Sequence, residues 1–179
     1  GYPDMLRALL ELQRMGVAFE AVIIGGGPLL KELESRAASL GIGKYVTFTG
    51  ALPFKEVGWR YGEADLFLFS GKVARSGDRA GFPNAIGEAM AWGLPVVATR
   101  VGAVTEGLRH GVTGMLADGP AEAAAQMARL YWEPDTFQSL RREARKWIEA
   151  QFHATRNMDC FARLIEKATQ RRSEEHTSE

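Results

Sequence analysis

The chain alternates short apolar runs with longer segments in which apolar residues recur every three or four positions. The short runs are rich in β-branched residues and predict buried strands, because a strand covered on both faces is apolar throughout. We expect strands at residues 19–24, 46–49, 66–69, 95–99 and 114–117. The spacing of three and four predicts amphipathic helices. We expect helices at residues 3–15, 29–40, 54–63, 83–92, 121–131, 134–152 and 154–169.

The alternation of strands and helices predicts an α/β fold. We expect a Rossmann-like parallel sheet with helices on both faces, because right-handed crossovers cover both sides, followed by a helical C-terminal segment. The carboxyl ends of parallel strands share one edge, and open sheets of this kind bind ligands there. Four parts of the chain should therefore converge: the turn at residues 25–27, Ser70, the loop at residues 71–82 and Gly102.

The loop at residues 71–82 leads into one of the predicted helices. Pro83 stands where the first helical turn begins and Gly93 follows the last one, which is the usual placement of these residue types. The loop therefore directs backbone N–H groups and the positive end of a helix dipole outward, which favours an anion such as phosphate. An ordinary loop before a buried helix explains the same pattern. Its basic residues, most often solvated at such positions, are Lys72, Arg75 and Arg79.

Glu88 is a charged residue in a helix that continues Ala-Met-Ala-Trp. A carboxylate in such a helix is costly unless it is paired or faces a cleft. It only accepts hydrogen bonds, so the two neighbouring hydroxyls of a ribose are a natural partner. The alternative is that local backbone N–H groups satisfy Glu88 in the manner of a helix cap.

Three glycines at residues 25–27 join a predicted strand to the next helix. Such a turn lets a ligand approach the backbone closely. The spacing does not match the dinucleotide pattern G-x-G-x-x-G, because Leu30 stands where the third glycine is required. This turn alone is weak evidence for a nucleotide, and a dehydrogenase is the least favoured class.

Composition narrows the class further. The chain has 179 residues, about one domain, and its 22 Lys and Arg balance 22 Asp and Glu, so no global field favours nucleic acid. Its three histidines lack metal-ligand spacing, and Cys160 is the single cysteine, which excludes an internal disulfide.

No apolar run approaches the roughly 20 residues of a membrane span. We expect a cytoplasmic protein without bound metal or nucleic acid. The basic residues at 141–146 predict a solvated helix face, with peripheral membrane contact as the second possibility.

Five motifs follow one another along the chain: I-I-G-G-G-P, V-T-F-T-G, A-D-L-F-L-F-S, G-F-P-N-A-I-G-E-A-M-A-W-G-L-P-V-V-A-T and E-G-L-R-H-G-V-T-G. With them, residues 1–170 resemble the donor-binding, C-terminal domain of family 4 (group 1) retaining glycosyltransferases of the GT-B fold. The resemblance implies a nucleotide-sugar donor, a UDP- or GDP-sugar, bound between two Rossmann-like domains without a cofactor. It also implies retaining transfer of a hexose to a saccharide or lipid-linked acceptor. The loop S-G-D-R is most similar to enzymes of bacterial exopolysaccharide and cell-surface glycan synthesis.

The resemblance assigns roles by motif position. Glu88 would hold the ribose hydroxyls of the donor. Gly81, Phe82 and Pro83 would present backbone groups to the sugar and diphosphate, and the helix N-terminus would stabilise the developing charge. The other positions that would contact the donor or line its cleft are Gly26, Gly27, Thr49, Gly50, Leu52 and Ser70.

Two features depart from the family pattern. The family's first glutamate falls at Ala80, which cannot contact the hydroxyls of the transferred sugar; Asp78 is a candidate substitute. The family's diphosphate-binding Arg and Lys, and its acceptor domain, would precede Gly1. We therefore expect residues 1–171 to be a nucleotide-sugar-binding domain that binds nucleotide weakly and turns nothing over alone. Residues 172–179 lack apolar periodicity and are expected to be a non-native tail.

Two other functions fit the same sequence features. A sugar-nucleotide epimerase has the same two-lobed architecture and a nucleotide pocket. The other is a degenerate, non-catalytic nucleotide-binding or interaction module, which is favoured by Ala80. Titration with UDP-, GDP- and ADP-sugars separates the classes, because a mere interaction domain ignores all three.

Overall fold

The computed structural model describes residues 1–72, 82–153, 155, 157–159 and 162–163. The predicted site residues Asp78, Ala80 and Gly81 lie outside these residues, as do the expected tail at 172–179 and most of the expected helix at 154–169.

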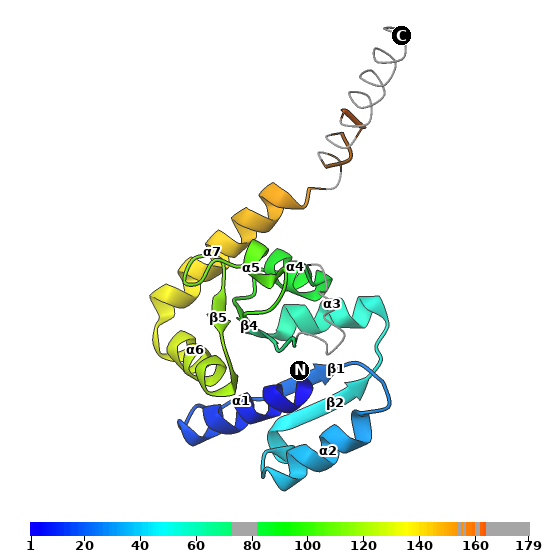
Figure 1. Cartoon of the computed structure of the whole chain (residues 1–179), viewed down its shortest axis with the longest axis vertical. Helices are drawn as coiled ribbons and strands as arrows, with labels where there is room; N and C mark the ends of the chain where they lie inside the picture. The colour runs from blue at the N-terminus through cyan, green and yellow to red at the C-terminus, as the bar shows by residue number, and fades with distance from the viewer. Residues whose placement is uncertain (73–81, 154, 156, 160–161, 164–179) are drawn as a thin grey trace, which may run out of the picture.

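Strands and helices alternate along the chain, as the sequence predicts (Figure 1). The strands are β1 (Ala21–Ile24), β2 (Val46–Gly50), β3 (Phe67–Phe69), β4 (Val96–Thr99) and β5 (Met115–Ala117). The helices are α1 (Tyr2–Arg14), α2 (Leu30–Ser39), α3 (Phe54–Glu63), α4 (Asn84–Ala91), α5 (Val104–Gly107), α6 (Pro120–Trp132) and α7 (Pro134–Gln151). A short 3-10 helix, η1 (Gly43–Tyr45), precedes β2 and is not predicted by the sequence pattern.

All strand pairs are parallel, which confirms the predicted α/β class. The hydrogen bonding differs from the expected single sheet, because the strands form two ladders with the orders β1-β2 and β3-β4-β5. The register pairs Ile23 with Phe48 in the first ladder and Val97 with Met115 in the second. Since β1 and β3 are not paired with each other, side-chain packing must hold the two ladders together.

Helix α1 provides this packing. Leu6 and Leu9 belong to the core cluster that α1 forms with α2 and the β1-β2 ladder. Ala8 and Leu12 belong to a second cluster, which α1 forms with β4, β5 and α6. The side chain of Leu68 on β3 packs against both clusters. Figure 1 shows α1 lying between the β1-β2 pair and α6, so one helix contributes to two cores.

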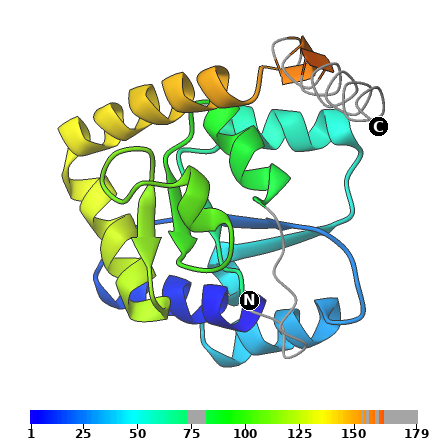
Figure 2. The same cartoon turned by 45° about the horizontal axis from the view of Figure 1, so that its top comes forward.

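Helix α4 is fixed from its C-terminal end. Gly93 has a φ of 76° and ends the helix, as its position in the sequence predicts. Arg141 donates to the Gly93 carbonyl at 2.8 Å, and Arg145 donates to the Ala91 carbonyl. Both arginines come from α7, which lies alongside α4 (Figure 2). Cations near a helix C-terminus also interact favourably with the helix dipole.

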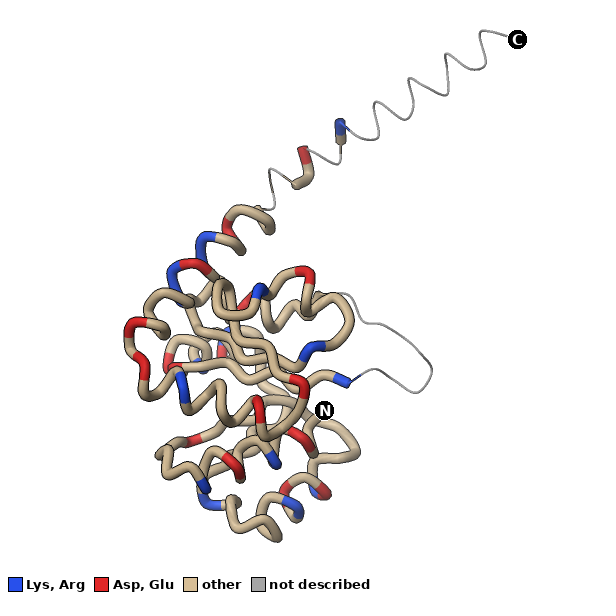
Figure 3. The backbone as a smooth tube through the Cα atoms, turned by 60° about the vertical axis from the view of Figure 1, so that its left-hand side comes forward, with Lys and Arg blue, Asp and Glu red and all other residues tan. Residues whose placement is uncertain are grey.

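Among the described residues, no helix combines the length and the apolar character needed to span a bilayer. Lys and Arg are interspersed with Asp and Glu over this part of the chain (Figure 3), as the balanced composition predicts.

We expect the substitution Leu6→Ala to destabilise the fold by about 2–5 kcal/mol, because it leaves a cavity beneath α1. Leu6 is fully buried. The control is Leu29→Ala, the same change at a leucine that is 53% exposed, for which a change within about 0.5 kcal/mol is expected. Urea unfolding measures both. Equal losses in the two variants would show that α1 does not contribute to the core in this way.

Candidate functional site

The glycine turn after β1 lies beside the end of β2. Gly25 donates its N–H to the carbonyl of Gly50 at 2.8 Å. Gly25 and Gly27 have φ of 140° and 150°, a backbone region that residues with a side chain rarely adopt. A Cβ at Gly26 would lie 3.6 Å from the backbone nitrogen of Ala51. The turn therefore follows the end of β2 closely, and Gly26 and Gly27 face solvent.

The first turn of α1 contacts both halves of the carboxyl edge. The hydroxyl of Tyr2 lies 3.8 Å from where a Cβ of Gly25 would stand. Ser70, just after β3, donates its hydroxyl to the carbonyl of Gly1 at 3.0 Å. Because β1 and β3 belong to different ladders, this turn of α1 is what brings the glycine turn and Ser70 to the same region.

Polar contacts hold the segment after β3. The hydroxyl of Thr99 accepts the Gly71 N–H at 2.7 Å and donates to the Gly71 carbonyl at 3.0 Å. Lys72 pairs with Asp4 of α1 at 2.7 Å. This hydrogen bond with Lys72 holds the pKa of the Asp4 carboxyl below its ordinary value. Lys72 is therefore engaged with α1, while the two other basic residues of the loop lie outside the described residues.

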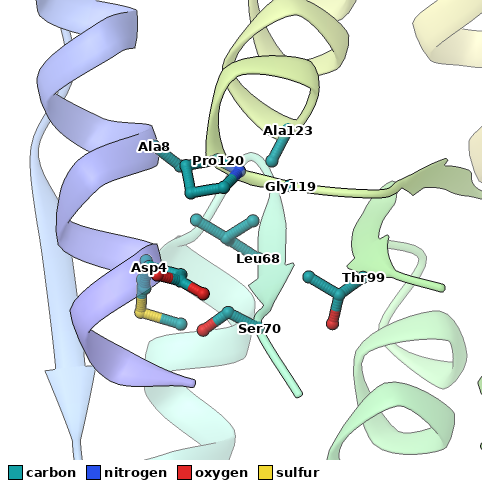
Figure 4. A pocket seen from close by; sticks show the side chains of 9 residues that line it. Asp4, Ala8, Leu68, Ser70, Thr99, Gly119, Pro120 and Ala123 are labelled. Carbon is teal, nitrogen blue, oxygen red and sulfur yellow. The ribbon is translucent and has the colours of Figure 1, made fainter. Parts of the chain in front are cut away.

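A small pocket lies where α1, β3, β4 and the start of α6 meet (Figure 4). Its walls are largely apolar, and the oxygens of Asp4, Ser70 and Thr99 stand toward one end of it (Figure 4). Its volume of about 10 Å³ has room for about one water molecule. A nucleotide is far larger, so this pocket is not a donor cavity.

The start of α4 is anchored by the side chain of Phe82. The Phe82 ring lies 6.0 Å from the Trp147 ring and 5.7 Å from the Phe152 ring, measured between centroids. A Cβ at Gly107 would stand 2.2 Å from the Phe82 ring, so the glycine leaves the space that the ring fills. The family resemblance implies a backbone role for Phe82, and the structure shows that its side chain packs at the entry to α4.

Pro83 is the N-cap of α4, with no side-chain cap. The first hydrogen bond at this end runs from Ile86 N–H to the Pro83 carbonyl at 3.0 Å. The N–H groups of Asn84 and Ala85 come before it, and N–H groups at the start of an α-helix have no partner within the helix.

Glu88 lies on the second turn of α4 and is partly buried. The hydroxyl of Tyr61, on α3, lies 3.2 Å from the Oε2 atom of Glu88 and donates to it. The same hydroxyl lies 3.3 Å from the carbonyl of Ala85, one turn earlier on α4. The carboxylate is thus paired with a side chain from another helix. Among the residues that the structure describes, no side-chain hydrogen bond caps the start of α4.

Tyr61 itself is held by its ring. The ring lies 5.9 Å from that of Phe67 on β3, centroid to centroid, with the planes tilted by 56°. Burial raises the pKa of the Tyr61 hydroxyl well above its ordinary value, and the charge of Glu88 and the hydrogen bond to it raise it further. The phenol is therefore a stable hydrogen-bond donor at neutral pH.

The structure brings the predicted site residues into two groups. The first group lies at the carboxyl ends of β1, β2 and β3 and consists of Gly26, Gly27, Thr49, Gly50 and Ser70. The second lies at α4 and consists of Phe82, Pro83 and Glu88. Leu52 follows β2 and is partly buried. Within the described part of the chain, no hydrogen bond or ion pair joins Glu88 to the first group.

Sequence reasoning missed Tyr61, Thr99 and Asp4. Tyr61 lies one turn after Val57 on α3, a helix of mixed apolar and polar residues. This spacing predicts the helix but does not predict a partner for Tyr61 on another helix. Of the basic residues of α7, Arg141 and Arg145 cap α4 rather than only facing solvent.

An α/β domain of parallel strands with glycine turns at their carboxyl ends is a class that binds ligands at that edge. Within this class, the chain belongs to the family described as glycosyl transferases group 1, whose model matches residues 1–133. This confirms the resemblance found in the sequence motifs.

Relatives with assigned names support the family. The chain is 34% identical over 163 residues to the GDP-mannose-dependent alpha-(1-6)-phosphatidylinositol monomannoside mannosyltransferase of Mycolicibacterium smegmatis, with 81% of this chain and 43% of that protein covered. It is also 34% identical over 164 residues to the amylovoran biosynthesis glycosyltransferase AmsK of Erwinia amylovora, with 90% and 40% covered. The chain thus spans about two fifths of the length of these relatives.

Solved structures support the fold. The structure of Anabaena Alr3699/HepE in complex with UDP and glucose matches with a TM-score of 0.76 at 21% identity, over 92% of this chain and 44% of that one. WaaG, a glycosyltransferase involved in lipopolysaccharide biosynthesis, matches with a TM-score of 0.69 at 19% identity, over 85% and 40%. The chain therefore shares its fold with part of each of these proteins.

The raised pKa of Tyr61 predicts how stability depends on alkaline pH. Tyrosines of the unfolded chain ionise near pH 10, and Tyr61 in the folded protein ionises at a higher pH. Between these two pH values the folded state holds one proton more than the unfolded state. The contribution of Tyr61 to the free energy of unfolding is complete below about pH 10 and is lost as the pH rises through the folded pKa. We expect urea unfolding to show that the free energy of unfolding falls more between about pH 9 and 11 for the wild type than for Tyr61→Phe. The control is Tyr131→Phe, at a half-exposed tyrosine on α6, which should behave as the wild type. An equal loss in Tyr61→Phe contradicts the prediction.

We expect Gly107→Ala to destabilise the protein by about 1–3 kcal/mol, because the new methyl group overlaps the Phe82 ring, which Trp147 prevents from moving freely. The matched control is Gly119→Ala, where a Cβ meets no atom within 4 Å and the backbone is extended. Denaturant unfolding compares the two variants. The packing of Phe82 against Gly107 is not as described if both are equally stable.

Proposed function

We propose that this chain is the donor-binding part of a glycosyltransferase that takes a hexose from a nucleoside diphosphate sugar. The observation that carries the proposal is the environment of Glu88, in a chain that belongs to this family. Glu88 is a partly buried carboxylate on α4, and within the described residues its one hydrogen-bond partner is the neutral hydroxyl group of Tyr61. A carboxylate only accepts hydrogen bonds, and Glu88 has lone pairs left for a ligand beside the Tyr61 hydroxyl, which suits the two hydroxyls of a ribose.

The start of α4 supplies the second part of the site. Backbone N–H groups and the helix dipole there favour negative charge, so a diphosphate leaving group is stabilised as its charge develops. Phe82 and Pro83 set the position of this helix start. In this arrangement the ribose lies one to two turns along α4 from the diphosphate.

The other predicted positions complete the proposed donor site. The glycine turn allows close approach of the donor to the backbone, the end of β2 and Leu52 lie near the base, and Ser70 lines the cleft. The roles of Gly81, Asp78 and Ala80 remain predictions from the family pattern. Transfer with retention of configuration rests on the same pattern.

Relatives narrow the substrate class. The M. smegmatis relative is named GDP-mannose-dependent, and the HepE structure contains UDP and glucose. AmsK is named for amylovoran biosynthesis and WcaL of Escherichia coli as a putative colanic acid biosynthesis glycosyltransferase. We therefore assign a GDP- or UDP-hexose as donor and a saccharide or lipid-linked acceptor in exopolysaccharide or cell-surface glycan synthesis, a reaction that belongs to the whole protein.

We expect Glu88→Gln to weaken binding of UDP or GDP by about tenfold or more, because a hydrogen bond to a charged group contributes about 1.5–3 kcal/mol. Isothermal titration of the chain with UDP, GDP and ADP measures this. The control is Glu32→Gln, an exposed glutamate on α2, which should bind as the wild type. If none of the three nucleotides binds the wild type, the chain is an interaction module and the proposal is wrong. If Glu88→Gln binds unchanged, Glu88 does not hold the ribose.

A further inference from the structure

Tyr61 and Glu88 are 27 residues apart in the chain and form a contact between α3 and α4. None of the residues of α3 is fully buried, so this helix depends on a few side chains for its position. Tyr61 is one of them, since it reaches Phe67 with its ring and α4 with its hydroxyl. A second contact lies further along α4, where the Trp92 ring stands 3.5 Å from the place of a Cβ on Gly62.

The hydroxyl of Tyr61 has one proton and two acceptors within reach. The Ala85 carbonyl lies 3.3 Å away and the Glu88 carboxylate 3.2 Å away. The charged acceptor makes the stronger bond, so the proton goes to Oε2 of Glu88. The Ala85 carbonyl lies one turn before Glu88 on the same face of α4, and it keeps the hydroxyl over this face.

This bond leaves most of the accepting capacity of Glu88 in place. An ionised carboxylate has about four lone-pair directions, and Tyr61 takes one of them on Oε2. A free glutamate side chain samples many rotamers, and restricting it to one geometry costs entropy at the moment of ligand binding. A donor that restricts the side chain beforehand removes part of this cost.

We propose that Tyr61 is a positioning residue that orients Glu88 for the ribose hydroxyls of the donor. The inference rests on the proposed function and adds a residue and a ligand preference to it. Tyr61 acts through Glu88 and not on the nucleotide itself. Its contribution should therefore exist only when the ligand carries ribose hydroxyls and position 88 carries the carboxylate.

The test is a cycle of four proteins and two kinds of ligand. The proteins are the wild type, Tyr61→Phe, Glu88→Gln and the double variant. The ligands are UDP or GDP, whichever binds the wild type better, and its 2′,3′-dideoxy form. Phenylalanine keeps the ring that packs on Phe67, so we expect Tyr61→Phe to fold, and its thermal midpoint is measured alongside. Tyr131→Phe is the matched control, the same change at an exposed tyrosine on α6.

We expect Tyr61→Phe to weaken binding of the ribonucleotide about three- to tenfold, and to leave binding of the dideoxynucleotide unchanged. In the Glu88→Gln background the same change should have no effect, and Tyr131→Phe should bind both ligands as the wild type does.

Three results overturn the inference. Equal weakening of both ligands by Tyr61→Phe assigns the residue to the general stability of the helix pair. Unchanged binding in Tyr61→Phe, while Glu88→Gln still loses its preference for ribose, removes the role of Tyr61 and leaves the proposed function intact. A wild type that binds both ligands equally, with Glu88→Gln also unchanged, overturns the role of Glu88 and the inference together.

Discussion

The packing of α1 between two separate strand ladders is the constraint on which the structure depends. Because β1 and β3 are not hydrogen-bonded to each other, no continuous sheet fixes the relative position of the ladders. Leu6 and Leu9 bury one side of α1 and Ala8 and Leu12 bury another. Burying a leucine side chain contributes roughly 1.5–3 kcal/mol, so these contacts have the strength to align the two halves.

This packing of α1 sets the geometry of the carboxyl edge of the domain. The first turn of α1 approaches the glycine turn through Tyr2 and Ser70 through Gly1, and its Asp4 pairs with Lys72. These groups come from segments that are far apart in the sequence. The small pocket where α1, β3, β4 and the start of α6 meet is too tight for a nucleotide, so the donor in the proposed function must lie along the surface of this edge and toward α4.

Helix α4 is held at several points by contacts with other elements. Phe82 fixes its start, Arg141 and Arg145 of α7 bind carbonyls at its end, and Tyr61 meets its polar face. Its other face is buried in the core through Ile86, Ala89 and Met90. A helix held in this way keeps the backbone of Glu88 in place, which suits the role that we propose for its carboxylate.

The sequence by itself determined the five strands, the helices α1 to α4, α6 and α7, their parallel strand arrangement and the choice of Glu88 as a candidate, because apolar periodicity and the placement of Pro83 and Gly93 are local properties of the chain. The short helices η1 and α5 are not among the elements that this periodicity predicts. Only the tertiary structure decided that the strands form two ladders, that α1 joins them and that Glu88 is paired with Tyr61. These facts depend on contacts between distant segments, and the period of a helix does not specify which side chain of another helix it will meet.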